Sequence, residues 1–175
     1  NPMLPPGHTA IAYIAGKLTP RVSLAATLVG GLLPDIDICL VLWPQFNQIH
    51  RVVTHNLLFI SMAAVLASLL VKRRRAVCLG MLWGGLLHLL ADACFDANPS
   101  NGIGVALLWP FSAQYFSPIN LLSPPANPVT WHQPRAMVQQ ALAGLWWEIP
   151  PGILALGLAS KDIRKPTANQ PTVKD

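Results

Sequence analysis

The chain has 175 residues, of which 53% are hydrophobic and only 11% are charged. Because a soluble domain of this length carries about 25% charged residues, the composition argues against a freely soluble globule or a disordered chain and indicates a protein that resides in lipid. The net charge of +5 comes largely from basic clusters that follow apolar stretches, which is typical of anchors at a membrane surface and argues against a nucleic-acid partner.

Apolar stretches predict an all-α, polytopic membrane protein with about four transmembrane helices. Residues 9–18 would cross only part of a bilayer, so we expect a partial N-terminal helix there. The first candidate span covers about 22–43 and contains the sequence Pro34-Asp35-Ile36-Asp37. The second, 57–71, has no charged residue and ends at Lys72. With one flanking residue at each end, this helix is about 25 Å long, close to a hydrocarbon core of about 30 Å.

The second half of the chain predicts two further spans separated by a long loop. The third candidate span covers about 76–95. Residues 96–136 are rich in Pro, Asn and Ser, which favours an ordered cap or a re-entrant loop. The fourth span, about 137–160, is apolar apart from two glutamines and Glu148, and we expect Pro150-Pro151 to interrupt it.

The positive-inside rule predicts the orientation of these spans. The turn Lys72-Arg73-Arg74-Arg75 is expected on the cytoplasmic side, and so is the C-terminus, which carries Lys161, Arg164 and Lys165. Residues 50–56 and 88–96 would then lie together at the outer face. The candidate polar residues described next therefore gather on one side of the membrane.

Ionisable side chains inside apolar segments are costly and mark candidate functional sites. His88 and Asp92 lie four residues apart, so one helix face would present an imidazole and a carboxylate to one metal ion. The alternative is a hydrogen-bonded His–Asp pair inside the bundle. Asp35 and Asp37 follow a proline. A broken helix end would aim both inward, whereas the alternative is a helix-terminating turn with an N-cap for the next segment.

His50 and His55 flank Arg51 at a spacing that is poor for a continuous helix. We expect a turn that carries His50, after which Thr54 caps the helix that carries His55. This turn and the His–Asp pair at the same membrane face together favour a metal site. Arg51 is expected either to bind a phosphate through its guanidinium or to form a salt bridge with one of the aspartates.

The candidate ligands are imidazoles and carboxylates, a set that suits Zn²⁺, Mn²⁺ or Fe. They outnumber the ligands of one tetrahedral site, so two or more ions bridged by a carboxylate such as Asp35 or Asp92 would account for the surplus. Clusters of this kind hold the attacking and leaving oxygens during phosphoester hydrolysis and activate water near neutral pH.

The ordered series of short motifs resembles a known family. His8 and Gly16 are followed by Leu33-Pro34-Asp35-Ile36-Asp37, His50-Arg51-x-x-Thr54-His55, His88-x-x-x-Asp92 and Gly102-x-Gly104-Val105-x-Leu107-Leu108-Trp109-Pro110-Phe111-Ser112. This series, over about residues 8–118, resembles the YdjM-type family of inner-membrane proteins regarded as metal-dependent hydrolases, which is distantly similar to the zinc-dependent phospholipases C. The chain departs from the family at Asn56, where serine is frequent, and at Ala91, where leucine is usual, but neither departure removes a ligand.

The resemblance implies a metal centre in the bacterial inner (cytoplasmic) membrane, with zinc as the favoured divalent ion. The implied ligands are His8, Asp35, His50, His55, His88 and Asp92. Asp37 would be a further ligand or a residue that orients a histidine, and could act as a base. Arg51 would stabilise the charge that develops on phosphate.

Several polar and aromatic residues outside this ligand set are expected to have structural roles or have more than one interpretation. His132 is expected to be a surface histidine of the polar loop, and Asp96 is expected to cap that loop. Glu148 has three interpretations: a late metal ligand, an acid whose pKa is raised by burial, or a hydrogen-bond partner for backbone freed by the proline kink. Trp109, Trp146 and Trp147 are expected to lie in the membrane interface.

The sequence therefore predicts one integral membrane domain over residues 1–165 and a flexible polar tail over 166–175. We expect a membrane-embedded, metal-dependent hydrolase that cleaves a phosphoester of a lipid or lipid-linked substrate with metal-activated water. The alternatives are a non-catalytic membrane metal-binding protein, such as a transporter, carrier or sensor, and a structural membrane protein whose His and Asp residues pair with one another.

Overall fold

The computed structural model describes residues 3–40, 42–95, 104–119 and 145–163 and positions 121, 133, 135, 136, 138, 139 and 142, with the backbone alone at 47, 48, 162 and 163. The elements are α1 (Pro5–Leu18), α2 (Leu24–Leu32), the 3-10 helix η1 (Leu33–Leu40), α3 (Phe46–Ile49), α4 (Leu57–Leu69), α5 (Arg74–Cys94), the 3-10 helix η2 (Leu145–Trp147) and α7 (Ile149–Ile163). These residues contain no strand beyond an isolated antiparallel bridge between Val105 and Phe116. The predicted all-helical fold is confirmed.

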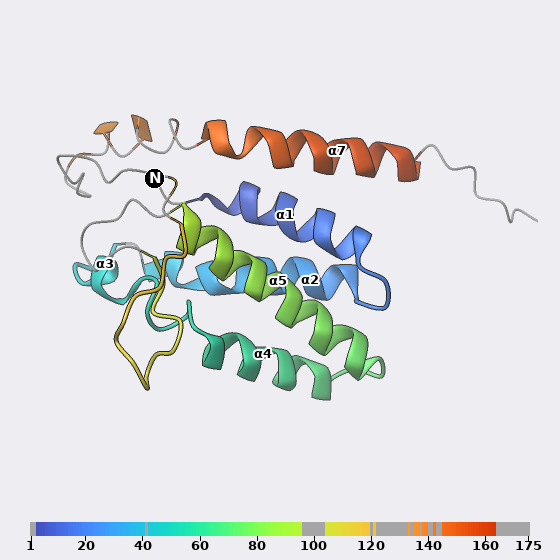
Figure 1. Cartoon of the computed structure of the whole chain (residues 1–175), viewed down its shortest axis with the longest axis horizontal. Coiled ribbons are helices and arrows are strands. Elements are labelled where there is room, and N and C mark those ends of the chain that lie inside the picture. The colour runs from blue at the N-terminus through green and yellow to red at the C-terminus, as the bar shows by residue number, and fades with distance from the viewer. Residues whose placement is uncertain are drawn as a thin grey trace, which may run out of the picture.

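Helix α5 is the centre of the bundle. It packs against α2, α4 and α1, while α7 lies outside on α1 (Figure 1). Among the described helices, α5 alone is both long enough and apolar enough to cross a membrane by itself. Helix α4 is a shorter apolar helix of 13 residues. The structure therefore confirms the helical architecture, and the number of spans remains a prediction.

The contact between α2 and α5 brings two backbones together at glycines. A Cβ atom on Gly84 would lie 2.0 Å from the carbonyl oxygen of Thr27, and one on Gly30 would lie 2.2 Å from that of Met81. A side chain of any size would force the helices apart, so glycine permits a close approach that is common between membrane helices. This contact sets where η1, which continues α2, lies beside the C-terminal half of α5.

Two predicted spans differ from the observed helices at prolines. The stretch predicted over 22–43 is α-helical only to Leu32 and then continues as η1, because Pro34 lacks the N–H that an α-helix needs and also restricts the residue before it. The stretch predicted over 137–160 is interrupted just before Pro150-Pro151, since η2 ends at Trp147 and α7 begins at Ile149. These prolines lie in the first turn of α7, where the missing N–H groups have no partner in the helix anyway.

Basic residues and the polar cluster lie at opposite ends of the bundle. The α1–α2 turn, the α4–α5 turn and the end of α7 lie together on the right in Figure 1. They carry seven basic residues, Lys17, Arg21, Lys72, Arg73, Arg74, Arg75 and Lys161, whereas the described Arg51 and Arg135 lie elsewhere. We call this the basic end. The other end holds η1, α3, residues 50–56 and residues 104–119, and we call it the site end.

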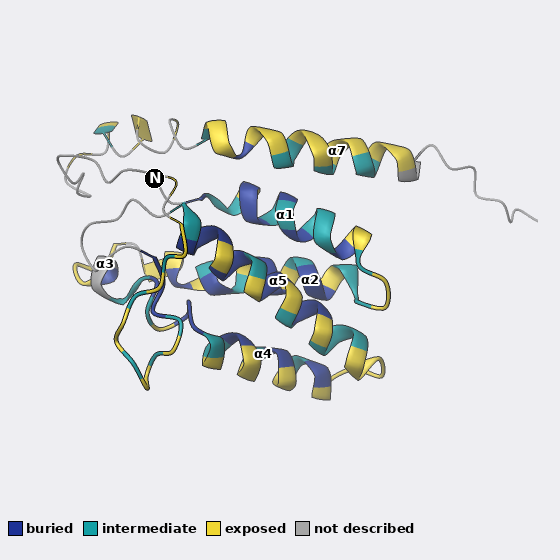
Figure 2. Ribbon diagram, viewed as in Figure 1, coloured by how far each residue is buried: buried dark blue, intermediate teal, exposed yellow. Residues whose placement is uncertain are grey.

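Apolar side chains cover much of the outside of the bundle, and several of the largest buried ones are polar. In Figure 2 the outer faces of α4 and α7 are exposed, although they carry residues such as Leu66, Ile153 and Leu156. The largest fully buried side chains include Arg51, His8, His55 and His88. This inverted distribution is expected for a chain whose surroundings are lipid.

Candidate metal centre

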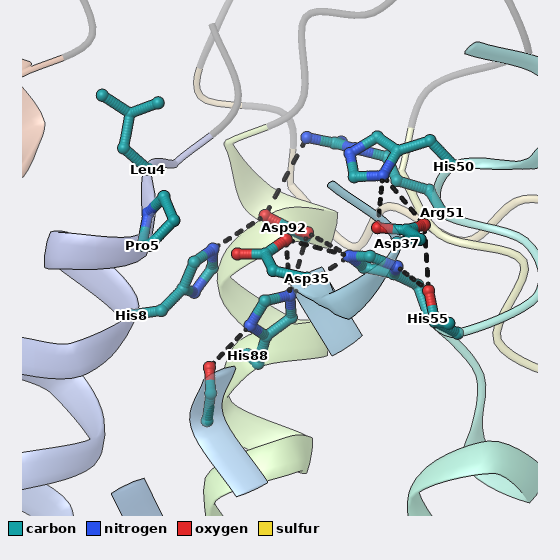
Figure 3. Close-up of polar contacts among 12 residues, drawn as sticks. Leu4, Pro5, His8, Asp35, Asp37, His50, Arg51, His55, His88 and Asp92 are labelled. Carbon is teal, nitrogen blue, oxygen red and sulfur yellow. Dashed lines mark hydrogen bonds and ion pairs between the residues drawn. The ribbon is translucent and has the colours of Figure 1, made fainter. Parts of the chain in front are cut away.

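Four separate segments bring their polar side chains to one point at the site end (Figure 3). His8 comes from α1, Asp35 and Asp37 from η1, and His88 and Asp92 from α5. The turn between α3 and α4 supplies His50, Arg51 and His55. All of the predicted site residues therefore lie in or beside one cluster, although they make different contacts.

Four of the predicted ligands face one another closely enough to share an ion, namely Asp35, His55, His88 and Asp92. The Nε2 atoms of His55 and His88 are 3.2 Å apart. His55 Nε2 lies 3.6 Å from Asp35 Oδ1 and 3.3 Å from Asp92 Oδ2. His88 Nε2 lies 3.7 Å from the same Asp35 oxygen and 3.4 Å from the same Asp92 oxygen.

These separations fit the ligand shell of one tetrahedral ion. With metal–ligand bonds of about 2.0–2.2 Å, the edges of a regular tetrahedron are about 3.3–3.6 Å long. Five of the six edges among the four donor atoms measure 3.2–3.7 Å. Two imidazoles and two carboxylates form a donor set that zinc accepts. The residues present could therefore hold one divalent metal ion.

Hydrogen bonds behind the two histidines orient their Nε2 atoms toward the shared point. His88 Nδ1 lies 2.8 Å from the carbonyl oxygen of Gly31, which can only accept, so Nδ1 donates. Thr54 Oγ1 donates to Asp37 Oδ2 at 3.0 Å and lies 3.0 Å from His55 Nδ1, so it accepts from that nitrogen. In the neutral rings, both Nε2 atoms therefore carry the lone pair that binds a metal.

His8 lies beside this four-residue cluster, next to Asp92 and His88. His8 Nε2 is 3.4 Å from Asp92 Oδ1, the carboxylate oxygen that does not face His55. The His8 ring stacks on the His88 ring at 3.8 Å between centroids. His8 Nε2, Asp35 Oδ2 and Asp92 Oδ1 are all buried without a hydrogen-bond partner. Such atoms are costly to bury unless something else binds them.

His50 is turned away from the four-residue cluster. Its Nδ1 atom lies 3.1 Å from both carboxylate oxygens of Asp37. Asp37, His50 and His55 form another group whose donor atoms are near enough to hold an ion. The structure thus places His50 with Asp37 rather than with Asp35 and Asp92.

The turn around Arg51 is held by the segment 104–119. Arg51 has a φ of +68°, a conformation that is uncommon for residues other than glycine. Its carbonyl oxygen accepts from the backbone N–H of Ala106 at 3.2 Å, and Leu107 accepts from Leu57 at 3.0 Å. The buried guanidinium approaches Asp92 Oδ1 at 3.9 Å. This is the salt bridge that was one of the two expectations for Arg51.

The sequence comparisons agree with this picture. Residues 3–162 match the model of a family described as YdjM inner membrane protein. The chain belongs to this family. It is also 26% identical over 161 residues to the inner membrane protein YbcI of Escherichia coli (strain K12), an alignment that covers 86% of this chain and 93% of that relative. No solved structure matches the chain.

Membership of the YdjM family shows an inner membrane protein, which associates with a lipid bilayer. The exposed apolar faces of α4 and α7 have a composition that suits contact with lipid chains. The match extends to residue 162 and so includes α7, which the motif series over 8–118 did not reach.

The pKa of His55 reflects both its burial and the carboxylates around it. Burial on its own lowers the pKa of His55, but the hydrogen bonds to Asp35 and Asp92 and the negative charges of Asp92 and Asp37 together outweigh it and raise the pKa to about 9. A metal ion must displace the proton from His55, because an imidazole binds metal in its neutral form.

Glu148 is not part of either metal-ligand group among the described residues. Its carboxylate accepts a hydrogen bond from the backbone N–H of Leu4, which precedes the first turn of α1. Burial raises the pKa of Glu148, and the bonds from Leu4 and Gly7 oppose this effect. The expected backbone hydrogen bond therefore exists, but its donors belong to α1 and not to a proline kink. A carboxylate is favourable there because helix N-termini carry partial positive charge.

The remaining expectations have mixed outcomes. Asn56, not Thr54, caps α4, since its Oδ1 accepts from Phe59 N at 2.8 Å. Trp146 and Trp147 are exposed, and Trp109 is half-buried. His132, Asp96 and the tail 166–175 lie outside the described residues.

Sequence reasoning missed two groups that orient the ligands: the Gly31 carbonyl and the hydroxyl of Thr54 as a bridge between Asp37 and His55. A backbone carbonyl leaves no signal in the sequence. The threonine was visible beside His55, but helix capping explained it equally well.

Proposed function

We propose that this chain is a membrane-embedded, metal-dependent hydrolase that cleaves a phosphoester of a lipid or lipid-linked substrate. The observation that carries the proposal is the set of five donor–donor separations of 3.2–3.7 Å among Asp35, His55, His88 and Asp92, which match a tetrahedral zinc ion. Zinc in such a site activates water and stabilises negative charge on phosphorus-bound oxygens.

A second divalent ion would engage the other oxygens of the same carboxylates. His8 Nε2, Asp35 Oδ2 and Asp92 Oδ1 supply three buried donor atoms without hydrogen-bond partners. His8, Asp35 and Asp92 would then hold the second ion. This arrangement assigns His8 a role that the four-residue cluster leaves open.

The chain's other site residues would bind and orient the reacting groups. The Arg51 guanidinium, 3.9 Å from Asp92, would hold a phosphate oxygen at the edge of the cluster. Asp37 holds His50 directly and His55 through Thr54. It would therefore keep both imidazoles oriented, and the Asp37–His50 pair would accept or supply the proton that hydrolysis moves.

The proposed topology has four spans: α2 with η1, α4, α5 and α7. Helix α5 is about 31 Å long, and α2 with η1 is about 30 Å long, both matching the hydrocarbon core. The basic end would face the cytoplasm under the positive-inside rule. The C-terminus would then be cytoplasmic, and the metal centre would face the outer, periplasmic side.

A non-catalytic metal carrier, transporter or sensor is the second candidate, and one observation favours it. Four protein side chains could all bind one ion, whereas catalytic zinc sites usually keep one position open for water. The hydrolase therefore requires that one carboxylate yields its position, or that the ion beside His8 provides the open one.

Metal analysis of the purified protein tests the proposal. The wild type should carry stoichiometric zinc, and His88→Ala and Asp35→Ala should lose it. His132→Ala, which changes the histidine predicted to lie on the surface of the polar loop, is the matched control and should retain zinc. A wild-type protein without a stoichiometric transition metal would overturn the proposal.

Turnover of phospholipids and polyprenyl phosphates by the zinc-loaded wild type separates the two candidates. The hydrolase predicts release of a phosphate-containing product, which Arg51→Lys should reduce by about 10²-fold or more. Stoichiometric zinc with no turnover of either lipid class favours the carrier.

A further inference from the structure

Three described segments at the site end carry no exposed charge, although Arg135, which lies outside them, is exposed. Residues 42–56, 104–119 and 145–148 contain only two residues of the Asp, Glu, Lys and Arg types, Arg51 and Glu148, and both are buried. A water-exposed surface usually has about 25–35% charged residues. These segments therefore lack the composition of loops that face water.

Large apolar side chains occupy this surface instead. We call six of them the apolar rim: Leu42, Trp43, Leu108, Phe111, Trp146 and Trp147. Leu42 is 90% exposed, Phe111 86% and Trp146 75%. They come from three segments, 42–43, 108–111 and η2, which lie beyond the helix ends at the site end (Figure 1). Tryptophan is typical of the membrane interface.

Helix length predicts how deep this end lies. Helices α1, α4 and α7 have 14, 13 and 15 residues, which gives lengths of about 20–22 Å against a hydrocarbon core of about 30 Å. With the basic end at one membrane surface, these helices stop about 8–10 Å below the opposite surface. The apolar rim extends into the depth that remains.

The metal centre lies at the same depth. His88 is 14 residues after Arg74, the first residue of α5, and so lies about 21 Å along the helix from the basic end. By the same measure Asp92 lies at about 27 Å. The four-residue cluster is therefore below the opposite membrane surface and not above it.

We propose that the apolar rim inserts into the leaflet opposite the basic end, so that the metal centre is reached from within that leaflet by an amphiphile that presents its phosphate at glycerol depth. The placement of the rim stands on exposure, charge and helix length alone, and the choice of substrate rests on the proposed function. Access from within the leaflet would select lipids in the bilayer over phosphoesters dissolved in water.

Lipid fits the rim better than a second copy of the chain does. The rim residues are divided among three segments around the site, and the opposite end is rich in lysine and arginine, which bind anionic headgroups. The two ends together therefore match the two surfaces of one bilayer.

Depth-dependent quenching of tryptophan fluorescence tests the placement. Variants that retain only Trp43 or only Trp146, with phenylalanine at the other five tryptophans, are reconstituted into phosphatidylcholine vesicles with bromines near the glycerol end of the acyl chains. Brominated lipid should reduce the emission of both by about twofold or more, while iodide in the water should quench little. A variant with Leu18→Trp as its only tryptophan, at the basic end, reports the opposite surface.

Strong iodide quenching of Trp43 and Trp146 without quenching by brominated lipid would overturn the inference. So would protection from both quenchers together with cross-linking between two copies. The zinc content of the same samples keeps the two proposals separate, because a rim in water with zinc still bound contradicts only the inference.

A cysteine variant covers the case in which the single-tryptophan chains do not fold. Phe111→Cys in the otherwise natural chain should react with a membrane-impermeant maleimide no more than the wild type does. Rapid labelling from the outer side of intact cells would place residue 111 in water and refute the insertion.

Discussion

Replacing Gly84 by alanine perturbs the contact that aligns the two elements of the metal centre. A Cβ at this position would lie 2.0 Å from the Thr27 carbonyl oxygen and 2.7 Å from the Gly31 nitrogen. Ordinary contact begins at about 3.4 Å, so α2 and α5 would have to separate by about 1.4 Å, since backbone atoms have no rotamer by which to yield.

This separation should affect the site as well as stability. The Gly31 carbonyl accepts from His88 Nδ1, and α2 leads directly into Asp35, which is 3.7 Å from His88 Nε2. A shift of that size would lengthen this edge beyond a zinc tetrahedron. Overpacking at a helix contact lowers the free energy of unfolding by about 1–3 kcal/mol, and disturbance of a ligand's supporting bond lowers metal affinity by about 10–100-fold.

Two measurements in detergent check the prediction: thermal unfolding followed by circular dichroism, and zinc affinity in competition with a chelator. Gly157→Ala is the matched control, because a Cβ there meets nothing within 4 Å. Loss of a helical glycine at that position should raise stability by about 0.5–1 kcal/mol. If Gly84→Ala behaves like Gly157→Ala in both measurements, the close contact does not hold the cluster together.

Three further outcomes are expected. Zinc affinity should fall about tenfold per pH unit on acidification below about pH 9, the pKa of His55, because zinc must displace its proton; titration with proton counting measures this. Asn56→Ala should lower the free energy of unfolding by about 1–2 kcal/mol, since it removes the cap of α4 and two bonds that the amide donates to the carbonyls of Val52 and Val53. Glu148→Ala should lower it by about 1–3 kcal/mol, whereas Glu148→Gln, which keeps an acceptor for Leu4 N, should retain most of the stability.

Each of these outcomes has a clear contrary result. Zinc affinity that is constant between pH 6 and 9 would mean that His55 does not bind the ion. Unchanged unfolding of Asn56→Ala, compared with Ser61→Ala on the same helix, would remove the capping argument. Equal losses in Glu148→Ala and Glu148→Gln would show that the charge, and not the hydrogen bond to α1, stabilises this contact.

The helices and candidate ligands could be predicted where charged residues stand out against apolar stretches of the sequence. The spans expected over 57–71 and 76–95 correspond to α4 and α5 within a few residues, because charged residues bound uncharged runs there. His88 and Asp92 stood out for the same reason, since ionisable groups are rare in apolar helices.

The partners of individual side chains and the exact helix boundaries could not be predicted, because they depend on contacts between residues that are distant in the sequence. The partner of Glu148 is 144 residues away. Thr54 and Asn56 are both capable helix caps, and only the course of the backbone decided between them. The pairing of His50 with Asp37 instead of the four-residue cluster follows from how the turn at Arg51 folds against Ala106. Pro150 and Pro151 mark a helix start as well as a break, so their position alone was ambiguous.

The bond between Leu4 and Glu148 also sets an order of assembly during synthesis. The ribosome adds about 5–20 residues per second, so the 144 residues between the two partners take about 7–29 s to emerge. Residues 35–92 are synthesised before then and can gather their histidines and aspartates. The start of α1 lacks its carboxylate partner until α7 arrives. The first turn of α1, which leads to His8, is therefore the last part of the centre to become fixed, and a chain truncated before Glu148 would leave this end of the site loose.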